Sequence, residues 1–221
     1  MPSRMLIVDD HALLRMAIRS MLTLDGDLEV VGEAGDGEEA LALCRQLRPE
    51  LVLMDVSMPK MCGIEATRAI KAECPKIGVL MLTAHTDHEL LLEAVRAGAA
   101  GYVLKSVDPD ELVGAVRRTL EGESPVDQEL VMRLVRSLAE EAGSTDRTAG
   151  APPPLTPREH EVLRHLAGGK TNRRISEDLH VSLSTVKRHI ERIVSKLDVS
   201  DRTQAAVKAV ELGLIDPERT K

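Results

Sequence analysis

Polar side chains that could bind a cation or attack an electrophile directly follow four apolar runs of the sequence. They are Asp9 and Asp10, Asp55, Thr83, and Lys105. Each alone could be a helix cap or a solvated charge, and Asp55 by itself is either a ligand-site residue or a cap. Four such positions are hard to attribute to capping, because the carboxyl ends of parallel strands meet at one sheet edge. The pattern therefore predicts a common site.

The residue types in this set favour phosphoryl chemistry assisted by a divalent cation. Three carboxylates close together repel and would raise one another's pKa, and a bound cation removes that problem. Hard oxygen ligands that leave room for water suit Mg²⁺. Asp55 would then stay ionised as a carboxylate nucleophile. Lys105 and Thr83 would hold the oxygens of a transferring phosphoryl group.

The apolar runs alternate with segments of helical periodicity through residues 1–122. Strands are predicted at 4–8, 28–31, 51–54, 77–82 and 102–104, and helices at 11–24, 37–47, 64–73, 87–97 and 108–120. Thr86 and Glu89 form a candidate capping box for the fourth helix. Five strand–helix units in alternation predict an α/β flavodoxin-like fold, which is a doubly wound parallel five-stranded sheet.

Length and charge indicate two domains of different character. The chain has 221 residues, more than one domain usually has. Residues 1–154 hold 16 Lys and Arg against 26 Asp and Glu, whereas residues 155–221 hold 13 against 10. The acidic amino-terminal part indicates a cation or phosphate site, and the basic carboxy-terminal part indicates an anionic partner.

Composition places the chain among soluble cytoplasmic proteins. The three cysteines have no metal-ligand spacing and cannot all pair, which fits a reducing compartment. No stretch resembles a signal peptide, and no apolar run is long enough to span a membrane. Tyr102 is the only aromatic residue apart from histidine, so the cores must be aliphatic.

Residues 123–154 are predicted to connect the two domains. A helical pattern runs from 127 to 142, and residues 143–154 read GSTDRTAGAPPP. Glycine, serine and three consecutive prolines are typical of a linker that is flexible and then stiff.

Residues 155–221 are predicted to form an all-α domain of four helices. Thr156 and Glu159 form a capping box with Pro157 at the first helical position. Further helices are expected at 172–179, from a cap at Ser184 to Leu197, and at 202–212. Two helices joined by a tight turn in such a unit suggest a helix-turn-helix.

The helix that follows Ser184 has one apolar and one basic face. The apolar face comprises Val186, Ile190, Ile193, Val194 and Leu197. The same helix holds Lys187, Arg188, Arg192 and Lys196, with Glu191 as its only acid. An ordinary amphipathic helix with solvated charges is the alternative interpretation. The basic excess favours a helix in the DNA major groove, with Thr171 and Asn172 touching phosphate.

Residues 1–121 resemble the receiver domain of bacterial two-component response regulators. The matching residues read VDD at 8–10, MDVSMP at 54–59, LTA at 82–84 and GYVLKS at 101–106. The resemblance implies that Asp55 accepts a phosphoryl group from the phosphohistidine of a sensor histidine kinase. It also implies that Asp10 binds Mg²⁺, with Asp9 and the Ser57 carbonyl assisting. Thr83 and Tyr102 would be the switch pair, and His85 is assigned no role.

Residues 155–212 resemble the LuxR-type helix-turn-helix of the NarL/FixJ response regulators. The matching residues include LTPREHEVL at 155–163 and TVKRHIERIVSKL at 185–197. The resemblance implies binding to double-stranded promoter DNA through Ser184, Lys187, Arg188, Glu191, Arg192 and Lys196. Glu191 departs from the family, which often has a basic residue there. Glu191 either accepts from cytosine N4 or faces away from the base pairs.

Together the two resemblances imply a DNA-binding transcriptional regulator that is not an enzyme, apart from its own phosphorylation and dephosphorylation. Phosphorylation would switch the receiver and favour a homodimer on the promoter. Two alternatives are a regulator that works without phosphorylation and, with less support, an aspartyl-phosphate phosphotransferase or phosphatase. The latter would need a substrate pocket, for which the sequence offers no residues.

Overall fold

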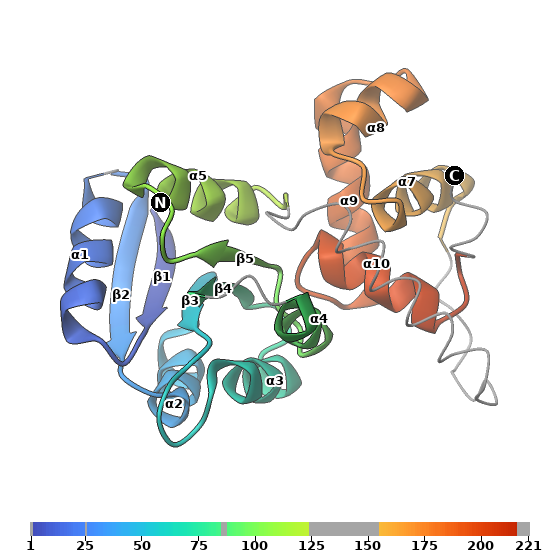
Figure 1. Ribbon diagram of the computed structural model, residues 1–221. Coiled ribbons are helices and arrows are strands. Elements are labelled where there is room, and N and C mark those ends of the chain that lie inside the picture. The colour runs from blue at the N-terminus through green and yellow to red at the C-terminus, as the bar shows by residue number, and fades with distance from the viewer. Residues whose placement is uncertain (1, 25, 85–87, 124–154, 216–221) are drawn as a thin grey trace. The chain divides into compact units, whose positions relative to one another are not determined.

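The computed structural model describes residues 2–24, 26–84, 88–123 and 155–215 (Figure 1). The chain separates into two compact units, Met1–Glu121 and Gly122–Lys221, and each is described by itself. The predicted helix at 127–142, the proline-rich segment and the Thr86 cap lie outside the described residues.

The first unit is built on a parallel sheet of five strands in the order β2-β1-β3-β4-β5. The strands are β1 (Ser3–Val8), β2 (Leu28–Ala34), β3 (Leu51–Asp55), β4 (Gly78–Thr83) and β5 (Gly101–Leu104). The helices are α1 (Ala12–Thr23), α2 (Gly37–Leu47), α3 (Gly63–Glu73), α4 (His88–Arg96) and α5 (Pro109–Leu120). The flavodoxin-like doubly wound fold predicted from the sequence is confirmed.

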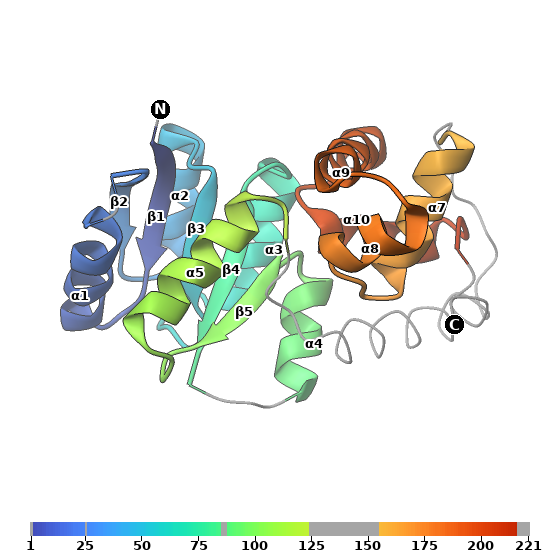
Figure 2. The same cartoon turned by 90° about the horizontal axis from the view of Figure 1, so that it is seen from above.

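Helices cover both faces of this sheet (Figure 2). Alternate strand residues such as Leu51 and Leu53 pack in the cluster that includes α1 and α5. Their neighbours Val52 and Met54 pack with α2, α3 and α4. Because every residue of β3 is buried, its sequence is an unbroken apolar run up to Asp55, as expected for the central strand of a parallel sheet.

The strand ends are held in register by backbone hydrogen bonds. The Asp9 N–H donates to the Ala34 carbonyl at 3.2 Å, and the Lys105 N–H donates to the Thr83 carbonyl at 2.8 Å. Asp55 pairs with Leu82 in the ladder between β3 and β4. The polar residues that follow the strands are thereby fixed along one edge.

Local signals account for the helix starts. Asp36 accepts from the Glu39 N–H at the start of α2, and Asp108 accepts from the Glu111 N–H at the start of α5. Both are standard amino-terminal caps, and Pro109 at the first position of α5 needs no hydrogen-bond partner.

Helix α3 begins in direct contact with the end of β3. The Gly63 N–H donates to the Val56 carbonyl at 3.0 Å. A Cβ atom at Gly63 would lie 1.9 Å from the Asp55 carbonyl oxygen, which is closer than real contacts allow. Only glycine therefore lets this helix approach the backbone of Asp55.

The second unit contains α7 (Pro157–Ala167), α8 (Asn172–Leu179), α9 (Leu183–Leu197) and α10 (Arg202–Glu211). Its aliphatic core includes Leu163, Ile175, Ile190 and Ala206. The capping box predicted at Thr156 and Glu159 is present. The predicted cap of the third helix is wrong by two residues. Ser182, not Ser184, accepts from the Thr185 N–H, so the helix begins at Leu183.

An ion pair between a buried carboxylate and an exposed lysine joins α7 to α9. Glu159 is only 2% exposed, and its Oε2 atom lies 2.7 Å from Lys196 Nζ. Burial alone would raise the pKa of Glu159. The ammonium of Lys196 and the N–H and hydroxyl groups of Thr156 outweigh that effect and lower the pKa to about 2.

Within the described residues, no helix is both long and apolar enough to cross a membrane.

We predict that Gly63→Ala destabilises the first unit by about 1–3 kcal/mol, because the new methyl group overpacks the end of β3. Urea unfolding of the full chain would measure this loss. Gly114→Ala is the matched control, since a Cβ there meets no atom within 4 Å. That helical substitution should stabilise by about 0.5–1 kcal/mol. Equal effects of the two substitutions would contradict the close approach.

We predict that Lys196→Met raises the pKa of Glu159, because burial is then opposed only by the hydrogen bonds from Thr156. In the native chain the pKa of Glu159 is depressed. Its stabilising contribution is therefore present above pH 4.5 and is lost as the pH falls towards 2. The contribution is on the order of 1–2 kcal/mol, after allowance for the exposure of Lys196.

A carboxyl chemical-shift titration of Glu159 would measure the change. Lys208→Met, which removes the exposed Lys208–Glu211 pair, is the control and should leave the titration unaltered. An unchanged Glu159 titration in Lys196→Met would show that the ion pair does not set this pKa.

Candidate functional site

The polar edge of the sheet brings together two buried carboxylates and one ammonium. Lys105 Nζ lies 2.7 Å from Asp9 Oδ2 and 2.9 Å from Asp55 Oδ1. Asp9 is 0% exposed and Asp55 is 3% exposed. Side chains from β3 and from the residues after β1 and β5 therefore meet at one point, as the sequence pattern predicts.

The electrostatics of this group are unbalanced. Burial raises the pKa of Asp55, and the negative charge of Asp9 acts in the same direction. Lys105 and the Ser57 N–H oppose the rise. Burial alone would lower the pKa of Lys105, but the carboxylates of Asp9 and Asp55 reverse this and raise it. One cation is thus shared between two anions that remain only partly neutralised.

Asp10 and His11 extend the cluster toward solvent. Asp10 Oδ1 lies 2.6 Å from His11 Nδ1, and Asp9 Oδ1 accepts the His11 backbone N–H at 2.8 Å. One ligand atom from each of Asp9, Asp10, His11 and Asp55 lies within 4.8 Å of all the others. Sequence reasoning missed His11, although its place beside Asp10 was a signal.

The residues present fit a divalent cation. Asp9 Oδ2 is buried, and its only partner within the described residues is the Lys105 ammonium, which it shares with Asp55. Three carboxylates against one ammonium leave an excess of negative charge. Carboxylate oxygens partly open to water are the donor set that Mg²⁺ prefers.

Thr83 and Tyr102 lie on neighbouring strands. Thr83 is 1% exposed, and Tyr102 is partly buried against the cluster that includes α3 and α4. The ladder pairs Met81 with Tyr102 and Thr83 with Leu104. Alternation along the strands therefore places Thr83 and Tyr102 on the same face of the sheet.

The basic face of α9 that the sequence predicts is exposed. Val186, Ile190, Ile193 and Leu197 are buried, while Ser184, Arg188, Glu191 and Arg192 are exposed and Lys187 is half-buried. Neither Arg188 nor Arg192 forms an ion pair with any residue that the structure describes. These two guanidinium groups are therefore available to an external anion.

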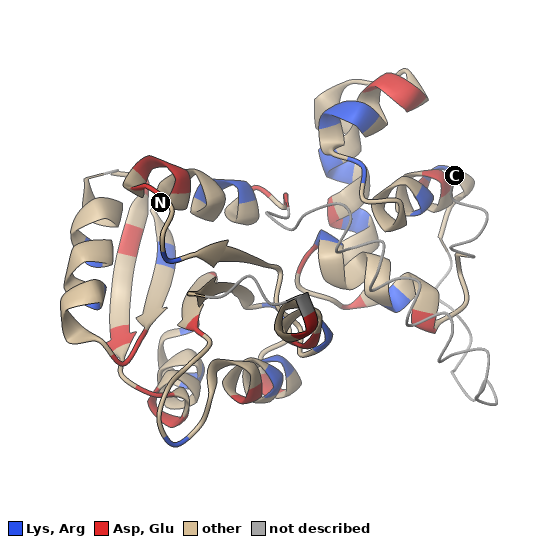
Figure 3. Cartoon of the chain, viewed as in Figure 1, with Lys and Arg blue, Asp and Glu red and all other residues tan. Residues whose placement is uncertain are grey.

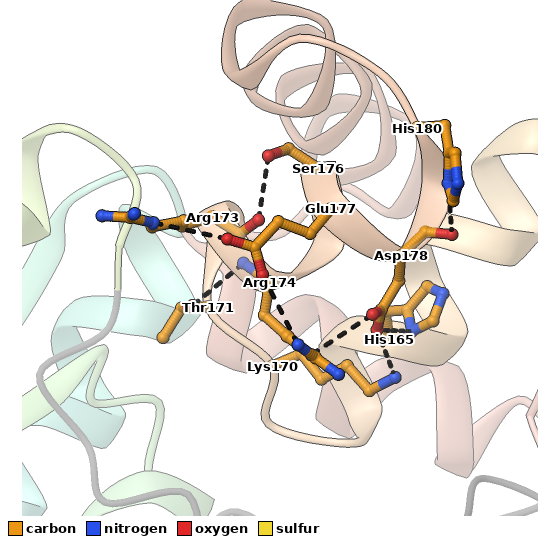
Figure 4. Close-up of polar contacts among 9 residues, drawn as sticks. All are labelled: His165, Lys170, Thr171, Arg173, Arg174, Ser176, Glu177, Asp178 and His180. Atoms are coloured by element: carbon orange, nitrogen blue, oxygen red, sulfur yellow. Dashed lines mark hydrogen bonds and ion pairs between the residues drawn. The ribbon is translucent and has the colours of Figure 1, made fainter.

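Helix α8 contrasts with α9 because its charges are paired internally (Figures 3 and 4). Arg173 Nε lies 3.4 Å from Glu177 Oε1, and Arg174 Nε lies 3.2 Å from Asp178 Oδ1. Asp178 also binds Lys170 Nζ at 2.7 Å. The basic excess of the helix-turn-helix consequently lies on α9.

The two residues at the start of α8 that were expected to touch phosphate differ in exposure. Thr171 is exposed and caps the helix by accepting from the Arg174 N–H. Asn172 is only 1% exposed, and its amide oxygen accepts from Arg202 Nη1 at 2.7 Å. Burial lowers the pKa of Arg202 to about 10. The Asn172 side chain thus serves the interior of the domain, and we leave it out of the interface proposed below.

Lys196 is also engaged within the domain. Its ammonium pairs with Glu159 rather than pointing along the exposed face of α9. The Lys196 ammonium is thus held by Glu159, although the side chain is 36% exposed.

Two families match the chain. The response regulator receiver domain matches residues 5–117, and the luxR family of bacterial regulatory proteins matches residues 153–209. The response regulator protein VraR of Staphylococcus aureus strain Mu3 is 39% identical over 215 residues, which cover 97% of this chain and all of VraR.

Two solved structures are similar to part of this chain. The receiver domain of the putative response regulator NarL from Mycobacterium tuberculosis is 35% identical with a TM-score of 0.54, covering 55% of this chain and 98% of that one. One chain of the CheX–CheY–BeF3–Mg²⁺ complex from Borrelia burgdorferi is 26% identical with a TM-score of 0.52. That match covers 54% of this chain and 90% of the other.

The acidic edge of the sheet, the basic helix and a match along almost the whole of a known regulator lead to one assignment. The chain belongs to the two-component response regulators that join a receiver domain to a LuxR-type DNA-binding domain.

Proposed function

We propose that Asp55 accepts a phosphoryl group from the phosphohistidine of a sensor histidine kinase and that this event controls DNA binding. The observation that carries the proposal is that Lys105 Nζ lies 2.7 Å from Asp9 Oδ2 and 2.9 Å from Asp55 Oδ1 at one sheet edge. Asp9, Asp10 and the Ser57 carbonyl would hold Mg²⁺ beside Asp55, and the cation would neutralise charge on the transferring group.

The transfer itself needs positioning more than covalent chemistry. A carboxylate oxygen of Asp55 forms the new O–P bond while the P–N bond to the donor histidine breaks. The electron pair stays on the leaving imidazole nitrogen, which takes up a proton. Lys105 contacts Asp55 already and would follow the incoming charge, and the Thr83 hydroxyl would donate to a phosphoryl oxygen.

We propose that Thr83 and Tyr102 transmit the effect of phosphorylation from the site to the rest of the receiver. Thr83 and Tyr102 share one face of the sheet beside α4. Movement of the Thr83 hydroxyl toward the phosphoryl group would open space that the Tyr102 ring can fill. Such a two-position element is what a phosphorylation signal needs to bias the receiver.

We propose that α9 is the helix that enters the major groove of promoter DNA. Arg188 and Arg192 would reach base edges, while Ser184, Lys187 and Thr171 would contact the groove edge and phosphates. Glu191 lies exposed on the same helix, where a carboxylate can accept from cytosine N4. A homodimer would place two such helices on one promoter site.

Asp55→Asn should abolish both phosphorylation by acetyl phosphate with Mg²⁺ and the stimulation of DNA binding, because the amide oxygen is a poor nucleophile. Mass spectrometry of the intact chain would detect the phosphoryl adduct. Binding would be measured on DNA selected from a random pool by the phosphorylated native chain. Asp110→Asn, an exposed acid of α5, is the control and should behave as the native chain.

Stimulation that persists in Asp55→Asn would support a regulator that works without phosphorylation. Sustained turnover of p-nitrophenyl phosphate by the native chain would instead support the phosphatase alternative. Sedimentation of the native chain with and without acetyl phosphate tests the homodimer.

Arg188→Ala should lower discrimination between selected and unrelated DNA by about 1–3 kcal/mol, because a base contact is lost. Lys187→Ala should weaken binding to both and reduce the slope of log affinity against log salt by about 1. Titrations at several salt concentrations would separate the two effects. Lys208→Ala on α10 is the control. Equal behaviour of all three variants would argue against α9 as the reading helix.

A further inference from the structure

The proposed phosphorylation site contains an imidazole that the Mg²⁺ assignment does not use. His11 immediately precedes α1 at its cap position, yet its side chain makes no capping hydrogen bond. The imidazole instead faces the acidic cluster, with Nδ1 2.6 Å from Asp10 Oδ1 and 3.3 Å from Asp9 Oδ1. Its position therefore needs an explanation other than helix capping.

The backbone holds His11 firmly in this place. Its N–H donates to Asp9 Oδ1 at 2.8 Å, and its carbonyl accepts from the N–H groups of Leu14 and Arg15 at 3.0 and 3.1 Å. The side chain is 70% exposed, so the ring can turn without displacing core residues. A fixed backbone with a free ring keeps a nitrogen within reach of the carboxylates.

The donor set differs from an all-oxygen site. A ligand atom of His11 lies within 4.8 Å of oxygens from Asp9, Asp10 and Asp55. Of these, Asp9 is fully buried, and within the described part of the chain its Oδ2 atom is paired only with Lys105 Nζ, at 2.7 Å. Mg²⁺ selects oxygen ligands, whereas imidazole suits later first-row divalent cations such as Ni²⁺ and Zn²⁺.

We propose that His11 supplies a nitrogen ligand to the cation site of Asp9, Asp10 and Asp55, so that the site takes a late first-row divalent cation in competition with Mg²⁺. His11 is then the residue that sets metal selectivity. The inference rests on the proposed function only in the location of the cation site.

Ni²⁺ and Mg²⁺ affinities measured by calorimetry on the full chain would test the selectivity. His11→Asn should weaken Ni²⁺ binding roughly tenfold or more, as expected for loss of one ligand, and change Mg²⁺ binding less than about twofold. Mg²⁺ should displace Ni²⁺ from the native chain. His180→Asn removes another exposed histidine and should leave both affinities unchanged.

Pulsed electron paramagnetic resonance of the Mn²⁺-loaded chain gives an independent reading. The native chain should show nitrogen hyperfine coupling, and His11→Asn should lose it. Equal weakening of Ni²⁺ and Mg²⁺ in His11→Asn would overturn the proposal, because it would mean that His11 only orients Asp10. Unchanged Ni²⁺ affinity would overturn it as well.

The same preparations separate this inference from the proposed function. If Mg²⁺ and acetyl phosphate phosphorylate both the native chain and His11→Asn while Ni²⁺ affinity is unchanged, only the role of His11 fails. If Asp55 is not phosphorylated in the native chain but the nitrogen coupling depends on His11, the metal site stands and the phosphoryl-transfer role fails.

Discussion

The receiver unit depends on the burial of more negative charge than it compensates. Asp9 and Asp55 are almost fully buried and share the ammonium of Lys105 at 2.7 and 2.9 Å. Burial raises the pKa of Asp55 because water is excluded from its carboxylate. Such an arrangement is costly without a further cation.

Tight packing holds these charges where they meet. The five strands form one parallel sheet. Helix α3 begins at Gly63, which lies directly against the backbone carbonyl of Asp55. A rigid edge of this kind preserves the distances between carboxylates. Thr83 and Tyr102 lie on one face of the sheet, on the two neighbouring strands β4 and β5.

The helix-turn-helix unit divides its charges between structure and surface. The buried Glu159 of α7 pairs with Lys196 of α9, and Asp178 binds Lys170 and Arg174. On α8 itself, Arg173 and Arg174 are paired with Glu177 and Asp178. Arg188 and Arg192 have no such partner among the described residues, and both are exposed on α9 one helical turn apart.

The sequence by itself determined the fold class, the order of the elements and the meeting of Asp9, Asp55 and Lys105 at one sheet edge. It could do so because apolar periodicity and strand-end positions are local signals. Only the tertiary structure showed that Asn172 and Lys196 are engaged inside the domain, that Ser182 caps α9, and that His11 faces the acidic cluster. These outcomes depend on which side chains from distant segments come within a few ångström, and no local pattern encodes that distance.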